Sequence, residues 1–529
     1  MDDDHGAEAS TPDRPSIGPP HQDGPLPSRM VATSSPVGRG LIAATALGSG
    51  MAFLDGSVVN VALPAIGREL GGGFATLQWV LESYLLTLAA LLLLGGALGD
   101  RYGRRRTFVV GLALFTAASL GCGLASTGSM LILARLVQGV GGALLIPGSL
   151  ALIDSSIRPE DRGRAIGTWA GLSGVAAALG PFVGGWLVDS ASWRWAFLIN
   201  LPLAALAVVL TLRYVPESRD TTISGRLDVV GAFSVSAGLG GVVFALIEGP
   251  ARGWSPSIVA LGVVGLLALA FFPLIELRTA SPLLPMSLFR SVQFTGANLV
   301  TLTVYAALGA ALFLLSLQLQ QTLGYSALAA GLALVPMTII MLLSGQVGAL
   351  AQSTGPRLPM VIGPLVAGVG LALLVRVVPG AGYVTAVLPG VALFGLGLVI
   401  TVAPLTSAVL AAVPEEHVGS ASGANNAIAR VAGLLAIAVL PLVTGLDSTG
   451  TGPLGPGFAH AMIICSALCG LGGIVAFLTI REGTPVRAHT MPGLTQPCQQ
   501  PSTREPVRAG ADGRISHDGS SGSSPPSPP

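Results

Sequence analysis

The chain has 529 residues, of which 51% are hydrophobic and 10% are charged, and its formal net charge is +1. A soluble domain carries about 25% charged residues, so most of this protein's surface must face lipid rather than water. The near-neutral charge gives no basic footprint for nucleic acid, and all 27 basic residues are arginine. Without lysine the chain has neither a P-loop lysine for ATP phosphates nor a Schiff-base lysine, which argues against an ATP-hydrolysing pump.

Apolar stretches of about 20 residues follow one another between two polar tails. Each stretch is long enough to cross about 30 Å of hydrocarbon as a helix, which predicts an all-α integral membrane protein. The tails, residues 1–38 and 481–529, are rich in Pro, Ser, Asp and Gly, which predicts disorder. The sequence predicts about fourteen spans, near residues 40–62, 76–98, 107–125, 129–152, 164–188, 194–213, 228–247, 257–277, 293–316, 327–349, 359–377, 383–406, 421–445 and 458–480.

Arginine is distributed unevenly over the connections between these spans. If the N-terminus lies inside, thirteen arginines fall in or beside connections on the cytoplasmic side and four on the opposite side. Basic residues are enriched on the cytoplasmic side of membrane proteins. The pattern therefore predicts a multi-pass protein of the inner (plasma) membrane with both termini in the cytoplasm.

The connection after the second span combines glycines with closely spaced charges. Glycines permit a tight turn, and an aspartate at helix ends can pair with cationic groups or with a helix N-terminus. We expect this segment to latch one conformation of the protein; the alternative is that its arginines only anchor the cytoplasmic side. The residues concerned are Gly96, Asp100, Arg101, Gly103, Arg104 and Arg105.

Arg135 lies inside the apolar fourth span. An arginine at that depth costs roughly 3 kcal/mol or more, so its side chain is expected to face the protein interior and to have a partner. The alternative is a structural arginine bonded to backbone carbonyl groups.

The fifth span repeats glycine at intervals of three or four residues and contains a proline. Small residues at that spacing form a smooth face for close helix contact, and proline bends a helix. We expect the close contact to seal a path on one side of the membrane. The residues are Gly174, Gly180, Pro181, Gly184 and Gly185.

Several of these segments resemble motifs of the major facilitator superfamily. Residues 96–106 are similar to its signature loop, residues 133–143 to its span-4 motif, and residues 171–185 to the antiporter motif that separates exporters from importers. Segments 54–64, 193–202 and 422–430 resemble motifs of the fourteen-span drug:proton antiporters. The resemblance covers nearly the whole chain outside the tails.

The resemblance implies the major facilitator fold, with two six-helix bundles and two extra central helices. Residues 1–38 would be a cytoplasmic tail, 39–213 the N-terminal bundle, and 214–292 a linker with the two extra transmembrane helices. Residues 293–480 would form the C-terminal bundle, and 481–529 a second cytoplasmic tail.

Two carboxylates, Asp55 and Glu82, lie in the first two spans. Burial disfavours the charged form of a carboxylate, so either group is a candidate to take up a proton on one side and release it on the other. The resemblance ties Arg135 to this proton coupling, because a nearby arginine favours the charged form. Asp55 has the alternative of capping or pairing at the outer end of its helix, where Gly56 would break the helix, and Glu82 that of contacting a cationic substrate.

The function implied is secondary active transport: proton-driven efflux of drug-like or antibiotic molecules by alternating access, with a role in antibiotic resistance. The expected partners are a small-molecule substrate, protons and the lipid bilayer, without nucleic acid or an obligatory protein partner. A proton- or ion-coupled importer on the same fold is the alternative. A membrane-embedded enzyme or a sensor is less well supported, since the sequence has no HExxH, no GxSxG, no clustered His or Cys ligands and no long soluble domain. We therefore expect no catalytic residue, cofactor or metal.

Overall fold

The computed structural model describes residues 30–219, 227–279, 282–343, 355–414, 417–446 and 454–481, all within one compact unit, Met1–Pro485. In these ranges the secondary structure is helical, and Val31 and Ile157 form an isolated bridge. The predicted all-α class is confirmed. The helices of the first half are α1 (Pro36–Leu70), α2 (Phe74–Tyr102), α3 (Arg104–Gly123), α4 (Gly128–Ser156), α5 (Pro159–Ser190), α6 (Trp195–Leu198) and α7 (Asn200–Tyr214).

The second half follows two helices that connect it to the first, α8 (Val229–Arg252) and α9 (Pro256–Arg278). Its helices and turns are η1 (Met286–Arg290), α10 (Val292–Gln321), α11 (Ala327–Ala333), α12 (Val335–Met341), α14 (Arg357–Leu373), η2 (Leu374–Arg376), η3 (Tyr383–Val387), α15 (Leu388–Ala411), α16 (Val418–Thr444) and α17 (Gly455–Thr479).

Among the described residues, thirteen helices are long and apolar enough to cross a membrane. They correspond to thirteen of the predicted spans. The remaining prediction, 327–349, falls on the short pair α11–α12, which together cover Ala327–Met341; residues 344–349 lie outside the described ranges. The first helix begins at Pro36, before the predicted boundary at residue 39, because Ser35 caps it by accepting a hydrogen bond from Gly38 N (3.0 Å).

The first helix also corrects the expectation that Gly56 interrupts it. Helix α1 runs without a break for 35 residues and passes through Gly56 and Pro64. Within a membrane the backbone has no water to bond with, so a continuous helix is favoured even where glycine has a low propensity. Asp55 therefore lies in the middle of a buried helix and is not an end cap.

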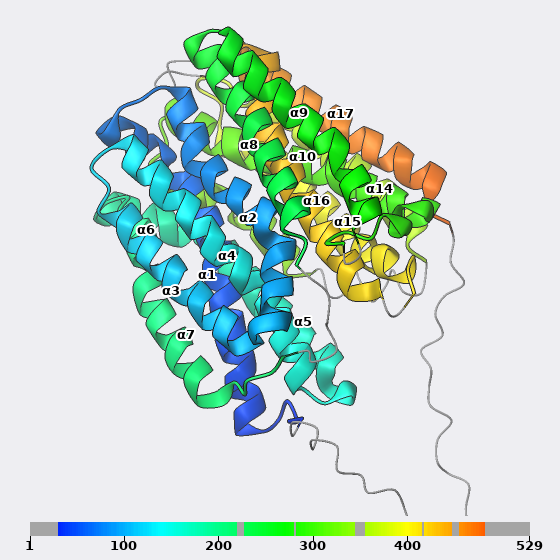
Figure 1. Cartoon of the computed structure of the whole chain (residues 1–529). Coiled ribbons are helices and arrows are strands. Elements are labelled where there is room, and N and C mark those ends of the chain that lie inside the picture. Colours follow the sequence, from blue (N-terminus) through cyan, green and yellow to red (C-terminus); the bar gives the residue numbers. More distant parts are fainter. Residues whose placement is uncertain are drawn as a thin grey trace, which may run out of the picture. The chain divides into compact units, whose positions relative to one another are not determined.

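Each half forms its own packed group of helices (Figure 1). In the first half α2 packs on α4, α1 on α5 and α7, and α3 on α4 and α7. In the second half α14 packs on α15 and α17, and α10 on α16 and α17. The pair α8–α9 packs together, and α8 contacts both α2 and α16.

We name the two ends of the helix bundle after the parts of the chain that lie there. The tail end is where α1 begins and α17 ends, and the loop end is the other. Among the described residues, the hydrogen bonds that join the two halves lie toward the loop end. Ser316 and Gln320 of α10 donate to Asn60 O (2.9 Å) and Val61 O (3.0 Å), and Gln78 donates to Ile437 O (2.8 Å).

A further contact closes the loop end between α5 and α11. The carboxylate of Asp189 accepts hydrogen bonds from Ala327 N (3.1 Å) and Leu328 N (2.8 Å), the first residues of α11. The tail-end half of α5 is exposed instead, and a side chain at Gly167, Gly171 or Gly174 would meet nothing within 4 Å. The two halves are therefore sealed together at the loop end, and no described residue of the second half packs on α5 at Gly167, Gly171 or Gly174.

Candidate functional site

An ion pair lies at the centre of the first half. The Arg135 guanidinium of α4 contacts the Asp55 carboxylate of α1 through Nη1 and Oδ2, and both side chains are 0% exposed. Arg135 Nε also donates to Val80 O on α2 (3.0 Å). Three helices are thus joined by one side chain, and both interpretations made from the sequence, an acidic partner and a backbone carbonyl, are present together.

Neutral polar side chains surround the pair. Gln138 Oε1 accepts from Arg135 Nη1 (2.7 Å), while its Nε2 donates to Asp55 Oδ1 (2.8 Å) and to Ser119 Oγ (2.8 Å). Asn200 Nδ2, at the start of α7, donates to Asp55 Oδ1 (3.1 Å) and to Ser119 Oγ (3.2 Å). We call Asp55, Arg135, Gln138, Asn200 and Ser119 the polar network; each member is buried.

Two aromatic rings complete the surroundings of the arginine. The Arg135 guanidinium carbon lies 4.3 Å from the centre of the Tyr84 ring and 5.7 Å from that of Phe197. The Tyr84 hydroxyl donates to Ala52 O (3.0 Å), which fixes the ring against α1. Because cation–π contacts strengthen when the groups are desolvated, the rings stabilise the positive charge if its carboxylate partner is neutralised.

Spare hydrogen-bonding capacity remains in the network. Arg135 Nη2 and Asn200 Oδ1 are buried and have no partner among the described residues. A fully buried donor and acceptor without partners are costly in a single resting state. These two atoms are therefore where the network has room for a further hydrogen-bond partner.

Glu82 is not part of this network. Its side chain is 0% exposed, and neither oxygen has a hydrogen-bond partner among the described residues. Gln78 and Leu86, one helical turn before and after it, face α16 and α8 respectively, so Glu82 lies at the junction of α2 with these helices. The structure thus brings Asp55 and Arg135 together and places Glu82 at another face of α2.

The predicted latch lies at the tail end and is bound to the chain after α7. Asp100 pairs with Arg104 (2.8 Å), and Arg105 N donates to Glu217 Oε1 (3.1 Å). Gly103 has φ 111°, and a side chain there would begin 2.8 Å from Glu217 Oε1, so glycine is required. Arg104 N also donates to Ser218 O (2.8 Å). In this conformation the latch backbone is bonded to Glu217 and Ser218, in the segment directly after the first half.

The remaining latch residues are Arg101 and Gly96. The Arg101 guanidinium lies 5.8 Å from the centre of the Tyr102 ring, and Gly96 faces the Pro147 ring of α4, where an added side chain would begin 3.6 Å away. There is therefore room for a small side chain at Gly96, unlike at Gly103.

The glycine motif of α5 divides into two parts. A side chain at Gly180 would begin 1.8 Å from Ser57 Oγ of α1, and one at Gly184 would begin 2.9 Å from Val58. A side chain at Gly185 would begin 2.5 Å from Ala327 O of α11. Gly180 and Gly184 thus allow α5 to pack closely on α1 within the first half, and Gly185 allows the contact with α11 that joins the two halves at the loop end. Gly174, in contrast, is exposed and meets nothing within 4 Å.

Pro181 belongs to the same contact. Its carbonyl oxygen lies 2.1 Å from the position that a side chain at Gly331 of α11 would occupy, so backbone approaches backbone across the two halves. Small residues on both helices are what make this approach possible.

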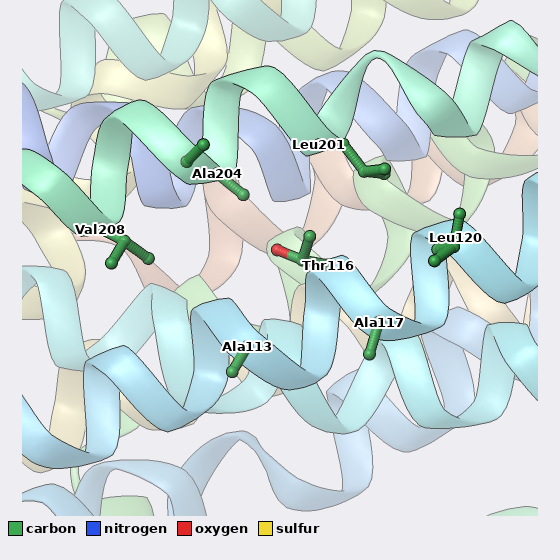
Figure 2. A pocket seen from close by; sticks show the side chains of 8 residues that line it. Ala113, Thr116, Ala117, Leu120, Leu201, Ala204 and Val208 are labelled. Carbon is green, nitrogen blue, oxygen red and sulfur yellow. The ribbon is translucent and has the colours of Figure 1, made fainter.

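Apolar grooves on the helix surfaces are weaker candidates for a binding site. The groove between α3 and α7 is lined by apolar side chains and Thr116 (Figure 2). The Thr116 hydroxyl already donates to Leu112 O (2.6 Å), so its proton is not available to a ligand and the groove is otherwise apolar. In the described part of the chain, no three His, Cys, Asp or Glu residues are grouped as a metal site would require.

From the sequence alone, no role is predicted for Gln138, Ser119 or Asn200. Polar side chains are rare inside apolar spans, and Gln138 lies one helical turn after Arg135. That spacing was a usable signal for Gln138. Asn200 and Ser119 come from distant parts of the sequence, so only the packed helices reveal that they meet Asp55.

The chain matches the family model described as Major Facilitator Superfamily over residues 45–437, and it belongs to that family. It is 36% identical over 459 residues to the methylenomycin A resistance protein of Bacillus subtilis, covering 85% of this chain and 97% of that protein. It is also 36% identical to the multidrug resistance protein Stp of Mycobacterium tuberculosis (75% of this chain, 74% of that protein). The probable actinorhodin transporter of Streptomyces coelicolor is 36% identical (82% and 78%).

Proposed function

We propose that the protein exports drug-like or antibiotic molecules in exchange for protons, by alternating access of a site between the two halves. The observation that carries the proposal is the buried Asp55–Arg135 pair, a titratable carboxylate held in a neutral polar network. The relatives named for resistance, multidrug resistance and transport support the direction and the class of substrate.

The coupling step is proton transfer to the Asp55 carboxylate. A proton bound at Oδ2 removes the negative charge and breaks the ion pair with Arg135 Nη1. Arg135 then keeps Gln138 Oε1, Val80 O and the Tyr84 ring, while its Nη2 can take a new partner. Because Arg135 joins α1, α2 and α4, this exchange of partners changes the packing of helices that also carry the loop-end seal.

Glu82 is the second candidate for the coupling carboxylate. Its oxygens have no partner among the described residues, and its helix face meets α8 and the second half. A proton there would neutralise a charge at the contact between the halves. Replacing each carboxylate in turn distinguishes the two sites.

The energy available fits secondary transport. One proton moving down 100 mV of membrane potential releases about 2.3 kcal/mol. That free energy supports a substrate gradient of somewhat less than a hundredfold, and a pH gradient adds to it.

For the orientation, we propose that the tail end faces the cytoplasm and that both termini lie there. The excess of arginine in connections at the tail end supports this placement. Residues 39–213 and 293–480 would then be the two bundles that rock against each other, with 214–292 carrying α8 and α9 between them. The structure would be the state open to the cytoplasm, ready to accept substrate from inside the cell.

In the proposed cycle the latch acts on the other state. Asp100, Arg101, Arg104 and Arg105 would meet the second half when the tail end closes. The contacts of α5 with α11 at Pro181 and Gly185 would part at the same time, while Gly180 and Gly184 would keep α5 packed on α1.

Efflux from everted vesicles tests the function. Vesicles containing the protein should accumulate a fluorescent drug-like dye when energised and lose this activity with a proton uncoupler. Asp55→Asn or Glu82→Gln, whichever is the coupling site, should abolish proton-driven accumulation. Asp154→Asn is the matched control, because Asp154 forms an exposed pair with Arg162 (3.2 Å) at the tail end. Accumulation that survives both the uncoupler and the two substitutions would refute proton coupling, and movement in the opposite direction would indicate an importer.

A further inference from the structure

Arg430 is a charge within the second half that no carboxylate balances in the described part of the chain. It lies in the middle of α16, half-buried, and its guanidinium carbon is 5.3 Å from the centre of the Phe53 ring on α1. Between residues 293 and 480 the sequence holds three acidic residues, Glu415, Glu416 and Asp447, and all three fall between the predicted spans. A partner within the membrane would therefore have to come from the first half or from α8 and α9, where Glu248 pairs with Arg252 and Glu276 accepts from Leu284 N (3.1 Å).

The carboxylates of the first half do not serve as that partner. Asp55 is already paired with Arg135. Both Glu82 oxygens are without a hydrogen-bond partner among the described residues, so Glu82 does not pair with Arg430 either, and the hydroxyl-bearing neighbours of Arg430 are Tyr84 and Tyr305. An arginine in a membrane helix is costly and normally marks a site with a specific partner. The missing partner is thus a negative charge supplied from outside the described residues.

The surroundings of Arg430 are aromatic and accessible. Phe53 and Tyr305 are both half-buried, and they come from α1 and α10, on opposite sides of the division between the halves. Gly56, one turn after Phe53 on α1, is also half-buried, and a side chain there would meet nothing within 4 Å. The face of α1 that carries Phe53 and Gly56 therefore has free space at Gly56, one turn from the ring that faces Arg430.

We infer that Arg430 binds the negatively charged group of the transported molecule, and that Phe53 and Tyr305 contact its ring. The substrate class is an aromatic or polycyclic compound with a carboxylate or an ionised phenol. A guanidinium pairs with a carboxylate through two parallel hydrogen bonds, and ring faces stack on both the substrate and the guanidinium. This inference rests on the proposed export function, because it describes the substrate of the proposed transport site between the two halves.

The site adjoins the polar network. Tyr84 lies close enough to Arg135 and to Arg430 to be influenced electrostatically by both. Tyr84 therefore adjoins both the Asp55–Arg135 pair and Arg430. This arrangement places substrate binding and protonation within electrostatic reach of each other.

Two dyes on one scaffold test the inference by binding, without transport. Fluorescein is an anion and rhodamine 6G is a cation, and both share a three-ring core. With the purified full chain in detergent, fluorescence anisotropy should show that Arg430→Gln weakens fluorescein binding roughly 10- to 100-fold, as expected for loss of a charge-assisted contact. Rhodamine 6G binding should change less than about threefold, and Arg430→Lys should keep part of the fluorescein affinity.

Arg357→Gln is the matched control. Arg357 also lies on an aromatic ring, 4.9 Å from the centre of Phe477, but at the tail-end start of α14. It should leave both affinities unchanged. Equal weakening of the two dyes by Arg430→Gln would overturn the inference, as would binding of rhodamine 6G alone by the unaltered protein.

If Arg430→Gln does not fold, a competition experiment on the unaltered protein tests the inference instead. Benzoate should displace fluorescein at concentrations where benzyl alcohol does not; equal displacement would overturn the inference. The vesicle assay stays separate: a protein that binds fluorescein through Arg430 but moves no dye refutes the proposed export and leaves the anion site standing. A protein that exports cationic dyes but does not bind fluorescein refutes the anion site and leaves the proposed export standing.

Discussion

The Asp55–Arg135 pair makes a quantitative prediction about stability. Removing one partner of a buried pair leaves the other charge unpaired, at a cost of about 3–5 kcal/mol. Both side chains are 0% exposed, and Arg135 Nη2 already lacks a partner among the described residues, so water cannot compensate the loss. We therefore expect Asp55→Asn and Arg135→Gln each to lower the free energy of unfolding by an amount in that range.

The double variant separates the pair interaction from the rest. With both charges removed, the two amides can bond to each other and to Gln138, so the combined cost should fall short of the sum by about 2–3 kcal/mol. Unfolding of the purified full chain in increasing dodecyl sulfate measures all four free energies. Asp154→Asn should cost less than about 1 kcal/mol, because its pair is exposed.

Two results would refute this reasoning. Single variants that each cost less than about 1 kcal/mol would mean that the pair is solvated or already dissociated. Costs that add within about 0.5 kcal/mol would mean that the two residues do not interact.

Three further predictions concern the other parts of the site. Glu82→Gln should change the free energy of unfolding by less than about 1 kcal/mol in the same titration, since its carboxylate has no hydrogen bond to lose among the described residues. Gly185→Leu should abolish vesicle transport, because its side chain would begin 2.5 Å from Ala327 O, whereas Gly174→Ala meets nothing within 4 Å and should transport normally. Glu217→Ala should speed hydrogen exchange at the Arg105 amide, which donates to Glu217 Oε1 (3.1 Å).

Each of these predictions has a contrary result. A loss of several kcal/mol in Glu82→Gln would reveal a partner for the carboxylate. Normal transport by Gly185→Leu would mean that α5 and α11 need not meet in the cycle, and unchanged exchange at Arg105 would mean that the latch is held by its other bonds.

The fold was largely predictable because a bilayer imposes a simple rule on sequence. Runs of about 20 apolar residues must be helices there, so the class and thirteen of the spans follow from hydropathy. The span 327–349 differs, since its described part is divided into α11 and α12 at Leu334. Val335 and Pro336 begin α12, and a proline, which lacks an N–H for the preceding turn, favours such a division.

The candidate site was less predictable because its contacts join distant segments. The cost of a buried charge indicated that Arg135 needs a partner, and the signal was strong at that one residue. Which carboxylate it meets depends on the rotation of α1 against α4, which hydropathy does not encode. Glu82 has similar apolar neighbours in sequence, yet its position on α2 directs it away from the network.

Helix α8 affects how apolar molecules can enter the space between the two halves from the bilayer. Its side chains Leu239, Val243 and Ile247 form one buried cluster with residues of α2 and α16, and Trp79 donates to Glu248 (2.7 Å). The joint between the two halves on this face is therefore covered along α8, and acyl chains cannot enter it. The joint beside the tail-end half of α5 has no such cover among the described helices. A compound dissolved in the bilayer would thus be kept out on the side of α8, whereas α5 borders the side that the described helices leave uncovered.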